Sequence, residues 1–133
     1  MGEHALGYFE YKPDTDTTWK TDEELGFRNR SLGHQHLFGW NHGKDIPVLP
    51  DQPRGWPDPD TMGEEVKALH EKHQKGPRYT GGWANITYIT GTDLPEINTE
   101  HLNHAWTAAV EHLEELAAKH GAENTRLVVY FNF

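Results

Sequence analysis

The sequence predicts an α+β fold, in which a small mixed β-sheet has two helices packed on one face. Three observations lead to this prediction. Residues 83–90 and 126–133 are rich in the β-branched and aromatic side chains typical of strands. Residues 58–75 and 98–120 show the apolar spacing of amphipathic helices. Residues 13–57 contain five prolines and follow neither period, which makes them a long irregular excursion between the first strand and the first main helix.

The composition fits one globular domain that spans residues 1–133. The chain is 35% hydrophobic and 11% aromatic, which is enough for a single core. Its formal net charge of -9 disfavours binding to nucleic acid or to an anionic membrane, so we expect neither partner. The sequence has no cysteine, which excludes disulfides and thiolate chemistry. No basic segment followed by an apolar run opens the chain, and we expect a cytoplasmic protein, or a virion component if the source is a phage.

Residues 5–12 predict the first strand, because they are rich in aromatics and stop at the turn-forming pair Pro13 and Asp14. The excursion that follows contains two local signals of its own. Thr21 and Glu24 match a capping box, which predicts a short helix ending near residue 27. Residues 36–40 and 45–49 flank the turn-forming sequence Asn-His-Gly-Lys, which predicts a small hairpin.

The first main helix is predicted to begin at Asp58, a good N-cap residue, because Pro59 suits the first helical position. It should end at Gly76. Its apolar face, with one histidine at the end, consists of Met62, Val66, Leu69 and His73.

The second helix is predicted to begin after Asn98 as N-cap, with Ile97 and Leu102 forming a hydrophobic staple, and to stop at Gly121. One face is apolar and should pack on the sheet: Leu102, Ala105, Trp106, Ala109, Val110, Leu113, Leu116 and Ala117. The opposite face should be solvated: His101, His104, Glu111, His112, Glu115 and Lys119.

The last strand, 126–133, is apolar on both faces, which predicts a position inside the sheet. If it lies beside and parallel to the strand at 83–90, the connection should be right-handed. Because the sequence ends in this strand, an uncovered edge there would invite pairing with another chain.

Histidines in the excursion suggest a metal site. His34 and His36 would point to one face of a strand, and His42 could approach across the turn. Asp45 or Asp51 would supply a carboxylate, as fourth ligand or as base. Zinc held there could lower the pKa of a bound water and support a hydrolase. The alternative is that these are ordinary polar loop histidines, since no established ligand spacing matches.

Arginines in the same excursion suggest a second alternative, a binder of small anionic ligands. Arg28, Arg30 and Arg54 could hold a carboxylate or phosphate in the bidentate manner that suits guanidinium groups, with Trp40 beside them. The sequence carries no phosphate-binding glycine motif that would support a nucleotide cofactor.

No catalytic signature is present, because the lone Ser31 lies outside a nucleophile elbow. Residues 28–56 hold a large apolar group that includes Trp40 and Trp56. Most of it should cover the sheet, while one or two aromatics stay exposed as anchors for a partner. The favoured hypothesis is therefore a non-catalytic interaction or assembly protein without a cofactor, which binds a protein partner or its own copies. A phage or accessory-genome product, such as a virion-assembly part or an inhibitor of a host protein, fits this description.

Overall fold

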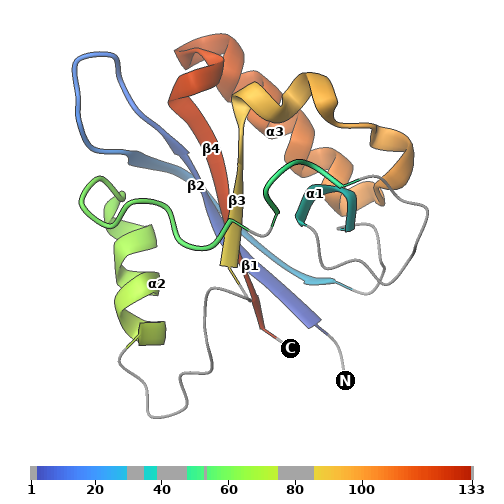
Figure 1. Ribbon diagram of the computed structural model, residues 1–133, viewed down its shortest axis with the longest axis horizontal. Coiled ribbons are helices and arrows are strands. Elements are labelled where there is room, and N and C mark those ends of the chain that lie inside the picture. The colour runs from blue at the N-terminus through green and yellow to red at the C-terminus, as the bar shows by residue number, and fades with distance from the viewer. Residues whose placement is uncertain (1–2, 30–34, 39–47, 53, 75–85, 133) are drawn as a thin grey trace.

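The computed structural model describes residues 3–29, 35–38, 48–52, 54–74 and 86–132 (Figure 1). The strands are β1 (Glu3–Tyr11), β2 (Lys20–Asn29), β3 (Ile86–Thr90) and β4 (Thr125–Asn132). The α-helices are α1 (Gln35–Phe38), α2 (Glu64–Gln74) and α3 (His104–His120). Three short 3-10 segments are η3 (Gly91–Glu96), η4 (Thr99–His101) and η5 (Ala122–Asn124).

The predicted α+β class is confirmed, but the sheet is antiparallel rather than mixed. The four strands lie in the order β2-β1-β4-β3, and each neighbouring pair is antiparallel. The 3-10 segments carry the chain away from the end of β3, and α3 then brings it back. Thr90 at the end of β3 consequently pairs with Arg126 near the start of β4, so the two strands run in opposite directions.

The short helix predicted from the capping box is wrong, because these residues form strand β2. β2 and β1 make a hairpin in which Gly7 pairs with Leu25 and Phe9 pairs with Glu23. The register shifts after Phe9, which leaves Asp22 as an extra, bulged residue. A capping box satisfies only two backbone groups, whereas the β1–β2 ladder satisfies a row of them and buries Leu25.

The hairpin predicted around residues 41–44 lies mostly outside the described residues. Of its described residues, 36–38 are helical and belong to α1, whereas 48–49 form no strand, although the Leu49 amide donates to the His36 carbonyl at 3.0 Å. Leu37 and Phe38 are fully buried, and the Phe38 ring lies 5.0 Å from that of Trp106 and 5.5 Å from that of Phe131, centroid to centroid. This part of the excursion therefore covers the sheet, as expected.

The two main helices lie on opposite faces of the sheet, and the expectation of both on one face is wrong (Figure 1). One face packs against α3 through Ala5, Phe9, Leu127, Val129 and Phe131. The other face packs against α2 and the loop before it through Tyr8, Ile86, Tyr88, Val128 and Tyr130. Because β4 alternates apolar residues to both sides, two separate covers are needed to shield it.

Both main helices begin later than predicted. Asp58 and Asp60 form a turn in which the Asp58 carboxylate accepts from the Asp60 amide at 3.0 Å, and α2 starts only at Glu64. Asn98 caps η4, while Asn103 caps α3 by accepting from the Trp106 amide at 2.9 Å.

The predicted stop of α3 at Gly121 is confirmed. This residue has a φ of 95°, a conformation that favours glycine. The strand predicted at 83–90 is confirmed over 86–90, and residues 75–85 lie outside the described part of the chain.

The last strand lies inside the sheet, as predicted, between β1 and β3. β4 pairs with β1 over residues 125–132 and with β3 over residues 126–130, so over residues 126–130 the terminal strand offers no open edge to a partner, contrary to that part of the hypothesis. The strands at the margins of the sheet are β2 and β3. Within the described part of the chain, no helix is long and apolar enough to cross a membrane.

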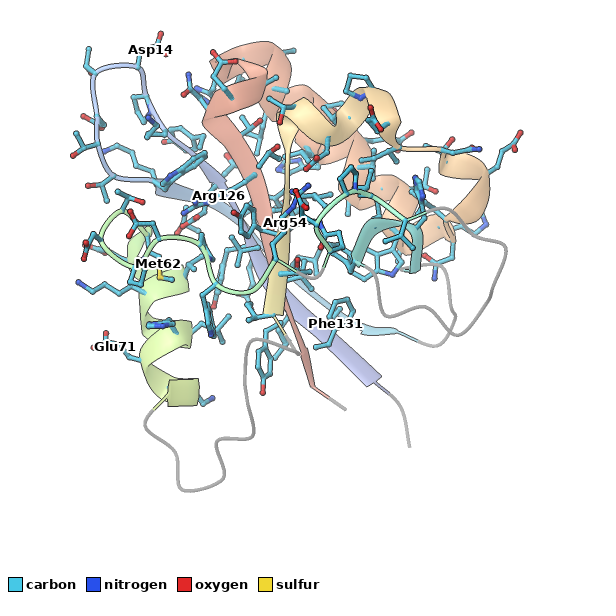
Figure 2. All side chains as sticks on the ribbon, in the orientation of Figure 1. Asp14, Arg54, Met62, Glu71, Arg126 and Phe131 are labelled. Atoms are coloured by element: carbon cyan, nitrogen blue, oxygen red, sulfur yellow. The ribbon has the colours of Figure 1, made fainter. Side chains whose placement is uncertain are left out.

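A buried ion pair joins the hairpin, α2 and β4. Arg126 Nε donates to Glu10 Oε1 at 2.7 Å, and the Gly63 amide donates to Glu10 Oε2 at 3.0 Å. The guanidinium lies over the Trp19 ring, 4.0 Å from its centroid, and Figure 2 places Arg126 towards the hairpin turn that carries Asp14. Burial raises the pKa of Glu10 and lowers that of Arg126, against the attraction between them. The removal of both charges from water therefore shifts these two pKa values more than the attraction between the charges does.

Removing one partner of this pair should destabilise the fold more than removing both. Glu10→Leu leaves the Arg126 charge buried without a counter-ion and should lower the free energy of unfolding by about 3–5 kcal/mol. Glu10→Leu combined with Arg126→Met should recover most of this loss. Urea denaturation measures both values, with Asp16→Ala in the exposed Asp16–Lys20 pair as a control that should change stability little. If the double variant lost as much stability as the Glu10→Leu and Arg126→Met single variants lose when their losses are added, this account would be contradicted.

Candidate functional site

One margin of the sheet, the outer edge of β3, is covered by Gln52 and Arg54. The Gln52 side-chain amide and Arg54 Nη1 both donate to the Tyr88 carbonyl, at 3.0 and 3.1 Å. The Arg54 amide donates to the Thr87 hydroxyl at 2.7 Å, and that hydroxyl also bonds to the Gln52 side chain. The Tyr88 carbonyl is a backbone group that an added strand would otherwise use, and the Thr90 amide, a second such group, donates to Asp93 Oδ2 at 2.8 Å, so this part of the β3 edge is obstructed.

Arg54 also forms a bidentate ion pair with Asp93, at 2.7 and 2.9 Å (Arg54 is labelled beside β3 in Figure 2). Both side chains are largely buried, with 15% and 13% exposed. Burial alone would raise the pKa of Asp93, but the hydrogen bonds from Arg54 and Thr90 outweigh it and lower the pKa. The pair fixes the covering segment to the start of η3.

The other margin, the outer edge of β2, has no such cover among the described residues. β2 pairs with β1 on one side only. Within the described ranges, no hydrogen bond from another segment reaches its outer backbone edge. An edge strand of this kind presents unpaired N–H and C=O groups in a row.

An apolar groove of about 270 Å³ runs between this edge of β2 and helix α3. Its walls are formed by Phe9, Glu23, Glu24, Leu25, Gly26, Ala105, Ala108, Ala109 and His112. The groove exists because α3 turns three alanines, Ala105, Ala108 and Ala109, towards β2. Larger side chains at these positions would fill the space between helix and strand.

One end of the groove carries carboxylates gathered around His112. His112 Nε2 lies 2.8 Å from Asp22 Oδ2 and 3.4 Å from Glu23 Oε2, and its Nδ1 lies 3.9 Å from Glu115 Oε2. The imidazole edge also meets the Phe9 ring, with centroids 4.4 Å apart. His112 was expected on a fully solvated face, but it tethers the acidic part of β2 to α3.

Of the candidate zinc ligands, His36 and Asp51 lie in the described part of the chain. The His36 side chain is buried in α1, where its Nε2 accepts a hydrogen bond from the Asn98 amide at 2.9 Å. Asp51 is exposed and has a positive φ of 63°, whereas His34, His42 and Asp45 lie outside the described residues. Within the described ranges, no group of three or more histidine and acidic side chains could hold a metal. The zinc site stays a prediction.

Of the candidate ligand contacts, Arg54 and Trp56 have described side chains. The Arg54 guanidinium is already paired with Asp93 and hydrogen-bonded to backbone carbonyls. Trp56 is half-buried and meets His70 on the α2 side, with ring centroids 4.7 Å apart. Arg28 lies in β2, but its side chain is outside the described part of the structure, as are Arg30 and Trp40.

A second cavity, of about 580 Å³, lies between the β1–β2 turn and the start of α2. Its walls are polar and formed by Asp16, Thr17, Thr18, Trp19, Lys20, Thr21, Glu64 and Glu65. Lys20 and Asp16 already pair across 3.5 Å. The shape of the β1–β2 turn forms this cavity, and none of the predicted site residues lines it.

Comparison with known proteins leaves the function to be argued from this geometry. No family model, no curated protein and no solved structure matches the chain.

The groove was not predicted, because its two walls were assigned separately and one was assigned wrongly. The capping-box pattern predicts a helix at Glu23 and Glu24, so the sequence does not indicate an edge strand there. The signal on α3 is the spacing of Ala105, Ala108 and Ala109, which puts small side chains on one flank of the helix. This spacing predicts a groove only when a strand is known to lie opposite that flank of the helix.

The Arg54–Asp93 pair makes stability depend on pH. Asp93→Asn should lower the free energy of unfolding at pH 7 by about 1.5–3 kcal/mol, the range for hydrogen bonds to charged groups. The folded-state pKa of Asp93 lies below its unfolded value, so its contribution is complete above the unfolded pKa of about 3.9 and is lost as pH falls through the folded one.

Urea titrations of the wild type and Asp93→Asn between pH 7 and about pH 3 measure this dependence. The difference between the two proteins should shrink as the pH falls. A difference that stays constant would show that the variant acts through packing instead of charge.

Proposed function

We propose that this chain is a non-catalytic protein-interaction protein that binds an extended segment of another protein as an added strand beside β2. The observation that carries the proposal is an apolar groove that runs along the edge of β2, an edge that no other described segment covers. The interaction hypothesis from the sequence is thereby kept, but its site moves from the excursion and terminal strand to β2 and α3.

Strand addition explains why both features occur together. A segment lying beside β2 would take up the unpaired backbone groups of the edge, and every second side chain would point into the groove. A volume of about 270 Å³ is small for a ligand pocket, which is typically about 300–1,000 Å³, and suits a few side chains of such a segment. The alanines of α3 leave room for them without any rearrangement of the helix.

The charges on β2 favour a different chain over a second copy of this one. Asp22, Glu23 and Glu24 stand in a row along the edge. Two antiparallel β2 strands paired with each other would bring these carboxylates close together, and like charges on neighbouring strands destabilise a sheet. The edge is therefore protected against self-association and open to a partner that lacks this acidic run.

Blocking the groove should abolish binding of extended peptides. Selection from a library of random peptides against the wild type should enrich sequences that bind it. Ala108→Trp places a large side chain in the groove and should reduce their affinity at least tenfold, about 1.4 kcal/mol. Ala118→Trp is the matched control, because Ala118 is also an exposed alanine of the same helix but lies outside the groove, and its substitution should leave affinity unchanged.

Amide hydrogen exchange separates strand addition from side-chain binding alone. A bound peptide that extends the sheet should slow the exchange of amides in β2. Peptides whose binding leaves β2 exchange unchanged, or survives Ala108→Trp, would contradict the proposal. So would a wild type that forms a dimer through β2 and is converted to a monomer by Ala108→Trp, as light scattering would show.

A further inference from the structure

We infer that the segment bound beside β2 is basic, with two consecutive lysine or arginine residues placed opposite Glu23 and Glu24. This inference rests on the proposed function, because it names the chemistry of the chain that fits the same groove. It follows from where the carboxylates stand, how accessible they are and what they pair with.

The first argument is the position of the two glutamates relative to an added strand. Glu23 pairs with Phe9 and lies on the α3 face, whereas the next residue, Glu24, pairs with Tyr8 and points to the opposite face. Residues directly opposite each other on neighbouring strands have Cβ atoms about 4.5–5.5 Å apart. Two consecutive residues of the added strand would therefore each meet a carboxylate, one on each face of the sheet.

The second argument is that these carboxylates are accessible and weakly compensated. Glu24 is exposed, and Asp22, Glu23 and Glu115 have side-chain exposures of 32%, 61% and 80%. Among the described residues, their ion-pair contacts are with His112 alone, and no lysine or arginine side chain reaches them. A cationic side chain of a partner would provide the counter-charge that the described residues do not supply.

The third argument is the neighbouring apolar position. Leu25 follows the two glutamates on β2 and is buried on the α3 face, beside the alanines of the groove. The residue of the added strand that lies opposite Leu25 should be apolar and small enough for this space. A basic pair next to a β-branched residue is thus the pattern that the edge accepts. The net charge of -9 would also speed the approach of such a segment at low salt.

Two synthetic peptides test the inference. Each has about eight residues, the length of an ordinary strand, and alternates valine and threonine around a central pair that is Lys-Lys in one and Gln-Gln in the other. Isothermal titration against the full chain should show the Lys-Lys peptide binding about fivefold or more tightly, and this advantage should fall as salt is raised.

Matched variants locate the effect. Glu23→Gln with Glu24→Gln should remove the advantage of the Lys-Lys peptide. Glu96→Gln with Glu123→Gln is the control, because it changes the net charge equally at exposed positions outside the groove and should keep the advantage. Urea denaturation of both double variants confirms that each is folded.

The outcomes separate the inference from the proposed function. Equal binding of both peptides, abolished by Ala108→Trp, would overturn the basic partner and leave strand addition in place. An advantage that both double variants lose equally would overturn it too, since the net field would then be responsible. If neither these peptides nor any library peptide binds, the proposed function itself fails.

Discussion

Strand β4 carries apolar residues on both faces, and the two cores of the molecule meet at it. Leu127, Val129 and Phe131 face α3, while Val128 and Tyr130 face the α2 side. A strand of this kind is stable only when both faces are covered and both edges are paired. Its central place between β1 and β3 therefore dictates a cover on each side of the sheet and leaves β2 at the margin.

The long excursion supplies the parts that this arrangement requires. The first part of the excursion forms β2, which pairs antiparallel with β1. In its middle part, Leu37 and Phe38 are buried beside α3. Its last described part closes the edge of β3 through Arg54 and Asp93. The buried pair of Glu10 and Arg126 then ties the hairpin to the loop before α2. Because desolvation opposes this pair, its role is to set which segments meet, more than to add net stability.

Another segment of the chain covers the edge of β3, whereas no described segment covers the edge of β2. The functional proposal depends on this difference. Hydrogen bonds from Gln52 and Arg54 occupy the edge of β3. Among the described residues the edge of β2 keeps its backbone groups unpaired, a groove beside it, and exposed carboxylates at one end. Charge on an edge strand prevents self-pairing, and together with the groove it also selects a partner of opposite charge.

The sequence by itself determined the elements whose signals are local and strong. The periodicity of α3, its stop at Gly121 and the two-sided apolar pattern of β4 depend on neighbouring residues alone, so the α+β class and the central last strand were predictable. Only the tertiary structure decided that residues 20–29 pair with β1, because their capping signal is weaker than a ladder whose partner is distant in the sequence. The groove needed both β2 and the alanines of α3, two segments that only packing brings together. The pairing of strands distant in the sequence thus determines where the candidate site lies, since no local sequence pattern indicates which strand lies at an edge of the sheet.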